Sequence, residues 1–86
     1  MARVMVVEDE AKIADLLATY LRKAGYQVSV APTGAKALEL ARQEKPELVL
    51  LDLMLPDMDG LDVCRQLRQD SSLPVIMVTA RDEEAP

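Results

Sequence analysis

The sequence contains no histidine, tryptophan or phenylalanine, only one cysteine, and two aromatic side chains, Tyr20 and Tyr26. Without histidine, the chain can have no His-based catalytic triad, no His metal ligand and no phosphohistidine of its own. The single Cys64 cannot form an internal disulfide, and we therefore expect a reducing, cytoplasmic location. Because aromatic side chains are so few, the hydrophobic core is expected to be aliphatic.

Charge and hydropathy argue against two further kinds of partner. The net charge of −5 disfavours nucleic acid as a partner of this chain, because phosphate backbones are bound by clustered Lys and Arg. No apolar run approaches the roughly 20 residues that span a bilayer, and no signal-peptide pattern is present. We therefore expect residues 1–86 to form no more than one small domain, without a membrane partner.

The hydrophobic pattern alternates between strand-like and helix-like segments. Strands are predicted at Val4–Val7, Gln27–Ala31, Leu48–Asp52 and Val75–Thr79, where short apolar runs occur. Three amphipathic helices are predicted between them: the first ends near Gly25, the second runs from an N-cap at Thr33 to Lys45-Pro46, and the third follows Gly60. The residues expected to face the sheet are Ile13, Leu16, Leu17, Tyr20 and Leu21, then Ala37, Leu38 and Ala41, then Leu61, Val63, Cys64 and Leu67.

Such alternation with short connections predicts an α/β domain with a parallel sheet covered on both faces. In these sheets, ligands bind beyond the carboxyl ends of the strands, where the strand order reverses. Four polar side chains fall at that edge. Glu8 and Asp9 follow the first strand, Asp52 ends the third strand and Thr79 ends the fourth.

Taken singly, each of these residues has a simpler structural explanation. An acid after a strand is often a solvated loop residue or an N-cap, and acids also suit the first turn of a helix. Asp57 and Asp59 are typical of a turn and a cap, Thr79 of a strand, and Cys64 of core packing. Three carboxylates and a hydroxyl at one edge are harder to explain as independent features.

The chemistry of three adjacent carboxylates favours a divalent cation. Two carboxylates about 4 Å apart repel by roughly 4 kcal/mol at an effective dielectric constant near 20, so a third needs a counter-charge. Hard oxygen ligands with open positions for water and phosphate suit Mg²⁺. The cation would neutralise an incoming phosphoryl group, and one carboxylate would act as the nucleophile on phosphorus.

Three segments, "VMVVEDE", "KPELVLLDLMLPDMDGLDVCRQLR" and "LPVIMVTA", resemble the receiver domain of two-component response regulators, especially the OmpR/PhoB-like transcription factors. They occur in the family's order and spacing, and the loop residues Pro56 and Gly60 also match. The resemblance implies a flavodoxin-like (CheY-like) doubly wound parallel sheet, whose full strand order is 2-1-3-4-5. Strands in the order 2-1-3-4 and three helices of that fold are expected here.

The resemblance also implies roles for individual residues. Asp52 would be the phospho-acceptor and Thr79 the switch hydroxyl that turns toward the phosphoryl group. Mg²⁺ would be bound by Asp52, directly by Asp9, through water by Glu8, and by the backbone carbonyl of Met54. The implied partner is a sensor histidine kinase, and intact members of the family catalyse their own phosphorylation and dephosphorylation.

One departure from the family is expected to matter. Receiver domains have roughly 120 residues, including a fifth strand, two more helices and a lysine that pairs with the phosphoryl group. We therefore expect an N-terminal part of a response regulator, natural or artificial, with impaired transfer and with its DNA-binding output domain elsewhere. The fourth strand is apolar on both faces, which is typical of a buried strand, but here it would be at the edge of the sheet. Such an edge can pair with another chain, which predicts a homodimer or a swapped oligomer.

Other readings of the same motifs fit less well. A dehalogenase-type phosphatase would need a second acid at Met54, and an EF-hand loop would start at Leu55 and end with an acid at Gln66. The sequence has no GxxxxGK[ST] motif for a P-loop enzyme. The alternative that stays open is a non-catalytic interaction or swapped-dimer module on the same scaffold.

Overall fold

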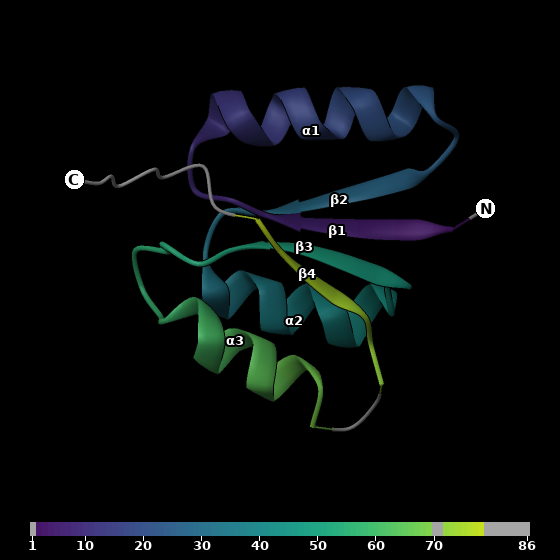
Figure 1. Ribbon diagram of the computed structural model, residues 1–86. Helices are drawn as coiled ribbons and strands as arrows, with labels where there is room; N and C mark the ends of the chain where they lie inside the picture. Colours follow the sequence, from purple (N-terminus) through teal and green to yellow (C-terminus); the bar gives the residue numbers. More distant parts are fainter. Residues whose placement is uncertain (1, 70–71, 79–86) are drawn as a thin grey trace.

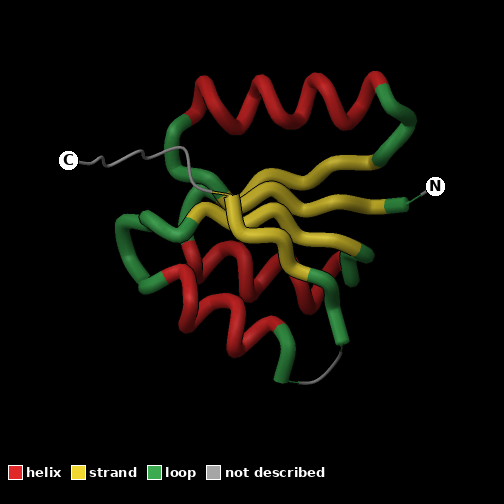
Figure 2. The backbone as a smooth tube through the Cα atoms, viewed as in Figure 1, coloured by secondary structure: helices red, strands yellow, loops and turns green. Residues whose placement is uncertain are grey.

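Four parallel strands form one sheet in the computed structural model, which describes residues 2–69 and 72–78 (Figure 1, Figure 2). The order is β2-β1-β3-β4, which confirms the predicted 2-1-3-4 arrangement. Thr79, the predicted end of the fourth strand, lies outside the described residues. The strands are β1 (Arg3–Val7), β2 (Gln27–Ala31), β3 (Leu48–Asp52) and β4 (Val75–Val78), and the helices are α1 (Ala11–Lys23), α2 (Gly34–Glu44) and α3 (Gly60–Leu67).

Helices cover both faces of the sheet: α1 lies on one face, and α2 and α3 lie on the other (Figure 1). The core between α2, α3 and the sheet is aliphatic, as predicted, and its buried members include Met5, Val49, Leu51 and Val63. These side chains come from the two central strands and from α3, which fixes the central strands against the helix layer. Over the described ranges, no helix is both long enough and apolar enough to cross a bilayer.

Two of the predicted helix boundaries are confirmed. The hydroxyl of Thr33 accepts a hydrogen bond from the Lys36 backbone N–H at 3.1 Å, which is the expected N-cap of α2. Gly25 follows α1 with φ of 101°, a conformation that favours glycine and stops the helix.

The predicted inner face of α1 is partly wrong. Leu16 and Tyr20 were expected to face the sheet, but their exposed fractions are 56% and 66%. Ala14 and Ala18 are buried there instead. Because alanine is small, it lets the helix lie close to the sheet, and the larger side chains two residues further along each turn point to solvent.

A similar correction applies to α3. Leu61 was expected to face the core but is exposed, whereas Val63 and Leu67 are buried. Cys64 is half-buried and packs against the core, which agrees with a packing role. The eight residues of α3 span little more than two turns, so hydrophobic spacing alone left its orientation open.

The fourth strand differs from its expected environment. β4 pairs with β3, and the structure as described gives it no second strand partner. The exposed fractions are 51% for Ile76 and 39% for Met77, although the apolar sequence predicted burial on both faces. The outer edge of the sheet is therefore apolar and unpaired over this part of the chain.

Candidate functional site

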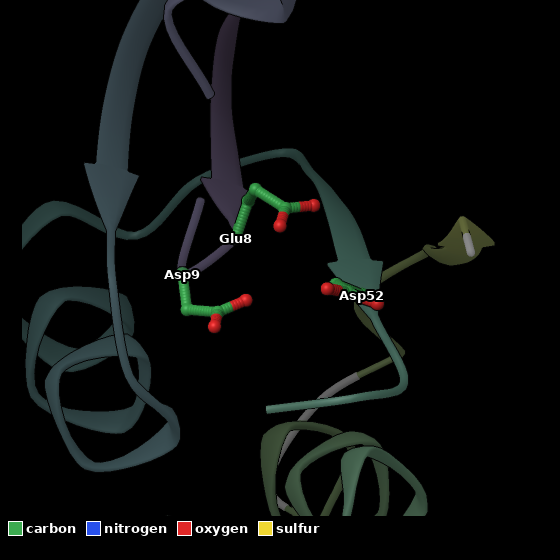
Figure 3. Close-up of side chains that lie close together, drawn as sticks. All are labelled: Glu8, Asp9 and Asp52. Atoms are coloured by element: carbon green, nitrogen blue, oxygen red, sulfur yellow. The ribbon is translucent and has the colours of Figure 1, made fainter. Parts of the chain in front are cut away.

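Acidic residues meet at the carboxyl ends of β1 and β3, which are neighbours in the sheet. Val7 pairs with Leu51 in the parallel register, so the next residues along the two strands, Glu8 and Asp52, lie side by side. Asp9 follows Glu8 at the start of the connection to α1. Figure 3 shows the three carboxylates around a common space beyond the ends of these strands.

The structure brings together three of the four polar side chains that the sequence placed at this edge. One carboxylate oxygen from each of Glu8, Asp9 and Asp52 lies within 4.8 Å of the others. Only 3% of Glu8 and 2% of Asp52 is exposed, whereas Asp9 is exposed to solvent. Two acids are thus buried beside a third, an arrangement that folding alone does not favour.

Backbone N–H groups hold the two buried carboxylates in place. Glu10 donates its backbone N–H to Glu8 Oε2 at 3.1 Å, and Met54 donates its backbone N–H to Asp52 Oδ1 at 3.0 Å. In addition, the Glu8 backbone N–H donates to the Ala31 carbonyl at 3.0 Å, which continues the pairing of β1 with β2. Both acids are therefore oriented by the local backbone before any ligand arrives.

Electrostatics at the cluster favour a bound cation. Burial raises the pKa of Glu8, the negative charges of Asp52 and Asp9 raise this pKa further, and the hydrogen bond from Glu10 opposes the rise. Ionising Glu8 therefore costs free energy, which a cation bound beside these carboxylates would offset. Three hard oxygen donors that converge in this way fit Mg²⁺, which takes few protein carboxylates and keeps open positions.

Replacing Glu8 by glutamine is expected to stabilise the metal-free protein at neutral pH. The pKa of Glu8 is higher in the folded state than its ordinary value of 4.5, so the wild type loses stability as the pH rises from that value through the folded-state pKa. Glutamine cannot ionise, yet its amide oxygen can still accept from Glu10. We expect a gain on the order of 1 kcal/mol at pH 7, the size of repulsion between partly solvated charges.

Chemical unfolding at pH 7 and pH 4.5 without divalent metal measures this effect. The difference between Glu8→Gln and wild type should shrink at the lower pH, because the raised pKa leaves a smaller share of wild-type Glu8 ionised there. A variant less stable than wild type at pH 7 would show that the ionised carboxylate is stabilising in the folded protein.

The loop between β3 and α3, residues 53–59, directly follows Asp52. At its base, Met54 forms an isolated antiparallel bridge with Asp59, and the Gly60 N–H donates to the Leu53 carbonyl at 3.3 Å. Met54, whose carbonyl the sequence predicted as a metal ligand, therefore lies in a closed turn directly after Asp52. Its role as a ligand stays a prediction, as does the role of Thr79, which lies outside the described part.

Sequence reasoning assigned Asp57 to a local turn, but the structure gives it a long-range contact. Asp57 Oδ1 accepts from the Gly34 backbone N–H at 2.8 Å, and Oδ2 accepts from the Ala35 N–H at 3.0 Å. These two bonds lower the pKa of Asp57. Because the bonded groups are 23 and 22 residues away, no local pattern could reveal them. Asp59 does act as predicted: it caps α3 by accepting from the Leu61 N–H.

Comparison with known proteins agrees with this geometry. Residues 4–86 match the family described as the response regulator receiver domain. The chain is 55% identical over 84 residues to the sensory transduction protein RegX3 of Mycolicibacterium smegmatis, covering 98% of this chain and 37% of that protein. It is 48% identical over 81 residues to the DNA-binding response regulator MtrA of Mycobacterium leprae, covering 94% of this chain and 36% of MtrA. The chain thus spans little more than a third of these relatives.

Solved structures show the same fold. The BeF3-activated receiver domain of Klebsiella pneumoniae RstA superposes with a TM-score of 0.88 at 41% identity, over 95% of this chain and 70% of that one. The chemotaxis protein CheY4 of Vibrio cholerae gives a TM-score of 0.89 at 29% identity, over 96% of this chain and 72% of that one. With its strand order, its acidic edge and these likenesses in agreement, the chain belongs to the receiver-domain family of response regulators.

Proposed function

We propose that Asp52 accepts a phosphoryl group from the phosphohistidine of a sensor histidine kinase, at a site that binds Mg²⁺. One observation carries this proposal: the nearly buried carboxylate of Asp52 lies within 4.8 Å of two other carboxylates at the ligand-binding edge of a parallel sheet. A non-catalytic module would gain nothing from two buried acids that repel each other, so the cluster favours chemistry over a purely structural role.

Each residue of the cluster has a distinct part in this mechanism. Asp9, Asp52 and the Met54 carbonyl would hold Mg²⁺ directly, and Glu8 would do so through water. When bound, Mg²⁺ supplies positive charge that stabilises the oxygens of the transferring phosphoryl group. Glu8 and Asp52 are kept in position by the N–H groups of Glu10 and Met54, so little reorganisation is needed during the reaction.

The transfer itself is an in-line displacement at phosphorus. A carboxylate oxygen of Asp52 forms a bond to phosphorus, and the bond from phosphorus to the imidazole nitrogen of the kinase breaks. The electron pair of that bond stays on the imidazole nitrogen, which leaves as the neutral ring after taking up a proton. The product is an acyl phosphate on Asp52, and the proposed switch hydroxyl of Thr79 would bond to one of its oxygens.

The proposal is tested with acetyl phosphate, a small phosphodonor that replaces the kinase. Intact-mass measurement should detect one added phosphoryl group in the presence of Mg²⁺ and none after chelation of the metal. The label should be lost on treatment with hydroxylamine, which cleaves acyl phosphates but not phosphoserine or phosphothreonine. Labelling that is independent of Mg²⁺, or that resists hydroxylamine, would contradict the proposal.

The wider role follows from the relatives. RegX3 is a sensory transduction protein and MtrA a DNA-binding response regulator, and the chain matches little more than a third of each. We infer that residues 1–86 are the N-terminal part of a cytoplasmic receiver. Its phosphorylation would control an output domain that binds DNA. This chain itself, with a net charge of −5, is not proposed to bind DNA.

We also propose that two copies of the 86-residue chain pair through β4. Its sequence, Val75–Val78, is wholly apolar, and Ile76 and Met77 are exposed beside an edge without a strand partner in the described structure. Such an edge is a template for strand addition. The other edge strand, β2, carries the polar residues Gln27 and Ser29 and is less suited to self-pairing.

Ile76→Lys is therefore expected to convert a dimer into a monomer in light scattering at micromolar concentration. A lysine on an edge strand opposes pairing with another chain, and Ile76 is exposed enough for the fold to tolerate it. Val30→Lys, on the exposed face of the opposite edge strand, is the matched control and should leave the dimer intact. A monomeric wild type would contradict the proposal.

A further inference from the structure

The β3–α3 loop, residues 53–59, is attached to the rest of the protein at two places. Its base is closed by the Met54–Asp59 bridge and by the hydrogen bond from Gly60 to Leu53. Its tip is attached to a different element, because Asp57 bonds the N-terminus of α2. The tip and the base are thus fixed independently of each other.

The contact at the tip is close and involves packing as well as hydrogen bonds. Both oxygens of Asp57 are used, one on each of the first two peptide N–H groups of α2. Beside them, the position of a Cβ on Gly34 would be 2.9 Å from Met58 Sδ, so the absence of a side chain at Gly34 lets the loop lie directly on the helix. A carboxylate also suits this place because the N-terminus of a helix carries partial positive charge.

We propose that Asp57 is a positioning residue for the metal site. By holding the tip of the loop on α2, Asp57 keeps the backbone at Met54 in the orientation in which its carbonyl completes the site formed by Glu8, Asp9 and Asp52. This inference rests on the proposed function. It makes the N-terminus of α2 part of the support for the phosphorylation site.

The physical argument concerns which parts of the loop the two attachments restrain. The base attachments fix the ends of the loop. In its middle, residues 55–58, Leu55 and Met58 pack against the core, and Asp57 supplies the hydrogen bonds to α2. Met54 takes part in two interactions: the bridge to Asp59 and the hydrogen bond from its N–H to Asp52. Movement of the middle of the loop therefore turns the peptide that follows Met54, and this peptide contains the Met54 carbonyl.

The test compares Asp57→Ala with Thr33→Ala in the 86-residue chain. Both changes remove a cap from the same helix, because the Thr33 hydroxyl accepts from the Lys36 N–H, but only Asp57→Ala releases the loop. Mg²⁺ affinity is measured by titration followed in ¹H–¹⁵N NMR spectra, together with the unfolding free energy of each variant. The two variants should lose comparable stability, since each loses capping bonds of α2.

Mg²⁺ binding should separate the two variants. Asp57→Ala is expected to weaken it roughly tenfold, as is common when a group that orients a ligand is removed. Thr33→Ala should stay within about twofold of wild type, because a lost cap affects mainly helix stability. Asp57→Asn should fall between these values, since one of the two accepting oxygens is replaced by an NH2 group that cannot accept.

Each outcome decides the inference. Equal Mg²⁺ affinity in wild type and Asp57→Ala would overturn it and leave the proposed function intact. Equal losses in Asp57→Ala and Thr33→Ala would also overturn it, because helix stability would then account for the effect. A wild type that binds no Mg²⁺ would overturn both the inference and the proposed function.

Discussion

The Asp52→Asn variant is expected to accept no phosphoryl group from acetyl phosphate, a loss of at least roughly 10³-fold in rate, because the nucleophile itself is removed. Asparagine has nearly the same shape, and its amide oxygen can still accept the hydrogen bond from the Met54 N–H. The fold should therefore be retained, and the loss can be assigned to chemistry. Intact-mass measurement after incubation with acetyl phosphate and Mg²⁺ gives the result directly.

The matched control is Asp62→Asn, the same change at an exposed acid on α3. Asp62 forms an ion pair with Arg65 at 2.6 Å on the protein surface, and the side chains of both residues are more than half exposed. Surface ion pairs of this kind contribute little to stability, so Asp62→Asn should label as wild type does. Unchanged, hydroxylamine-sensitive labelling of Asp52→Asn would show that Asp52 is not the acceptor.

The strand order and the acidic edge were predictable because they depend on patterns that extend along the chain. Four apolar runs separated by helical periods specify a parallel sheet, and the carboxyl end of each strand is fixed by where its run stops. Glu8 and Asp52 could therefore be placed at one edge from sequence alone. The register of β1 and β3, in which Val7 pairs with Leu51, then brings them side by side.

The orientation of the helices was less predictable. A hydrophobic period indicates that one face of a helix is buried but fixes its direction only to within about one residue. In α1, the alanines Ala14 and Ala18 occupy the buried stripe and Leu16 and Tyr20 do not, because close approach to the sheet favours small side chains. This preference depends on the distance between the helix and the sheet, which cannot be predicted from the sequence pattern.

Long-range contacts of the loop were also beyond the reach of local patterns. Aspartate is a common turn residue, so the sequence predicts only a local role for Asp57. Its hydrogen bonds to α2 exist because the segment after β2 and the segment after β3 lie close together in the fold. The Gly34 position is similar: its proximity to Met58 and Val63 is visible only when α2 and α3 are packed. Both residues support the site from outside the acidic cluster.

Gly60 gives the second large expected effect, because its surroundings leave no room for a side chain. A Cβ on Gly60 would lie 2.6 Å from Leu53 Cα and 3.1 Å from the Asp52 carbonyl oxygen. These are backbone atoms at the end of β3, so they cannot move aside as the end of a side chain can. Gly60→Ala must therefore displace either the start of α3 or the backbone next to Asp52.

We expect Gly60→Ala to lower the unfolding free energy by about 2 kcal/mol, the range found for overpacked sites, even after alanine's better helix propensity is counted. Gly34→Ala is the matched control: each glycine is the first residue of its helix, α2 or α3. The nearest atoms to a Cβ on Gly34 are the side-chain atoms Met58 Sδ and Val63 Cγ2 at 2.9 Å, and the flexible Met58 can shift.

Urea unfolding should therefore show a larger loss for Gly60→Ala than for Gly34→Ala, where the close atoms belong to side chains and the gain in helix propensity offsets part of the strain. Because the obstacle at Gly60 is the backbone beside Asp52, the destabilised variant should also show shifted NMR signals for residues 52–54. Equal stability losses in the two variants would mean that the Leu53 backbone shifts as easily as the side chains beside Gly34, and the backbone next to Asp52 would then be less rigid than its contacts imply.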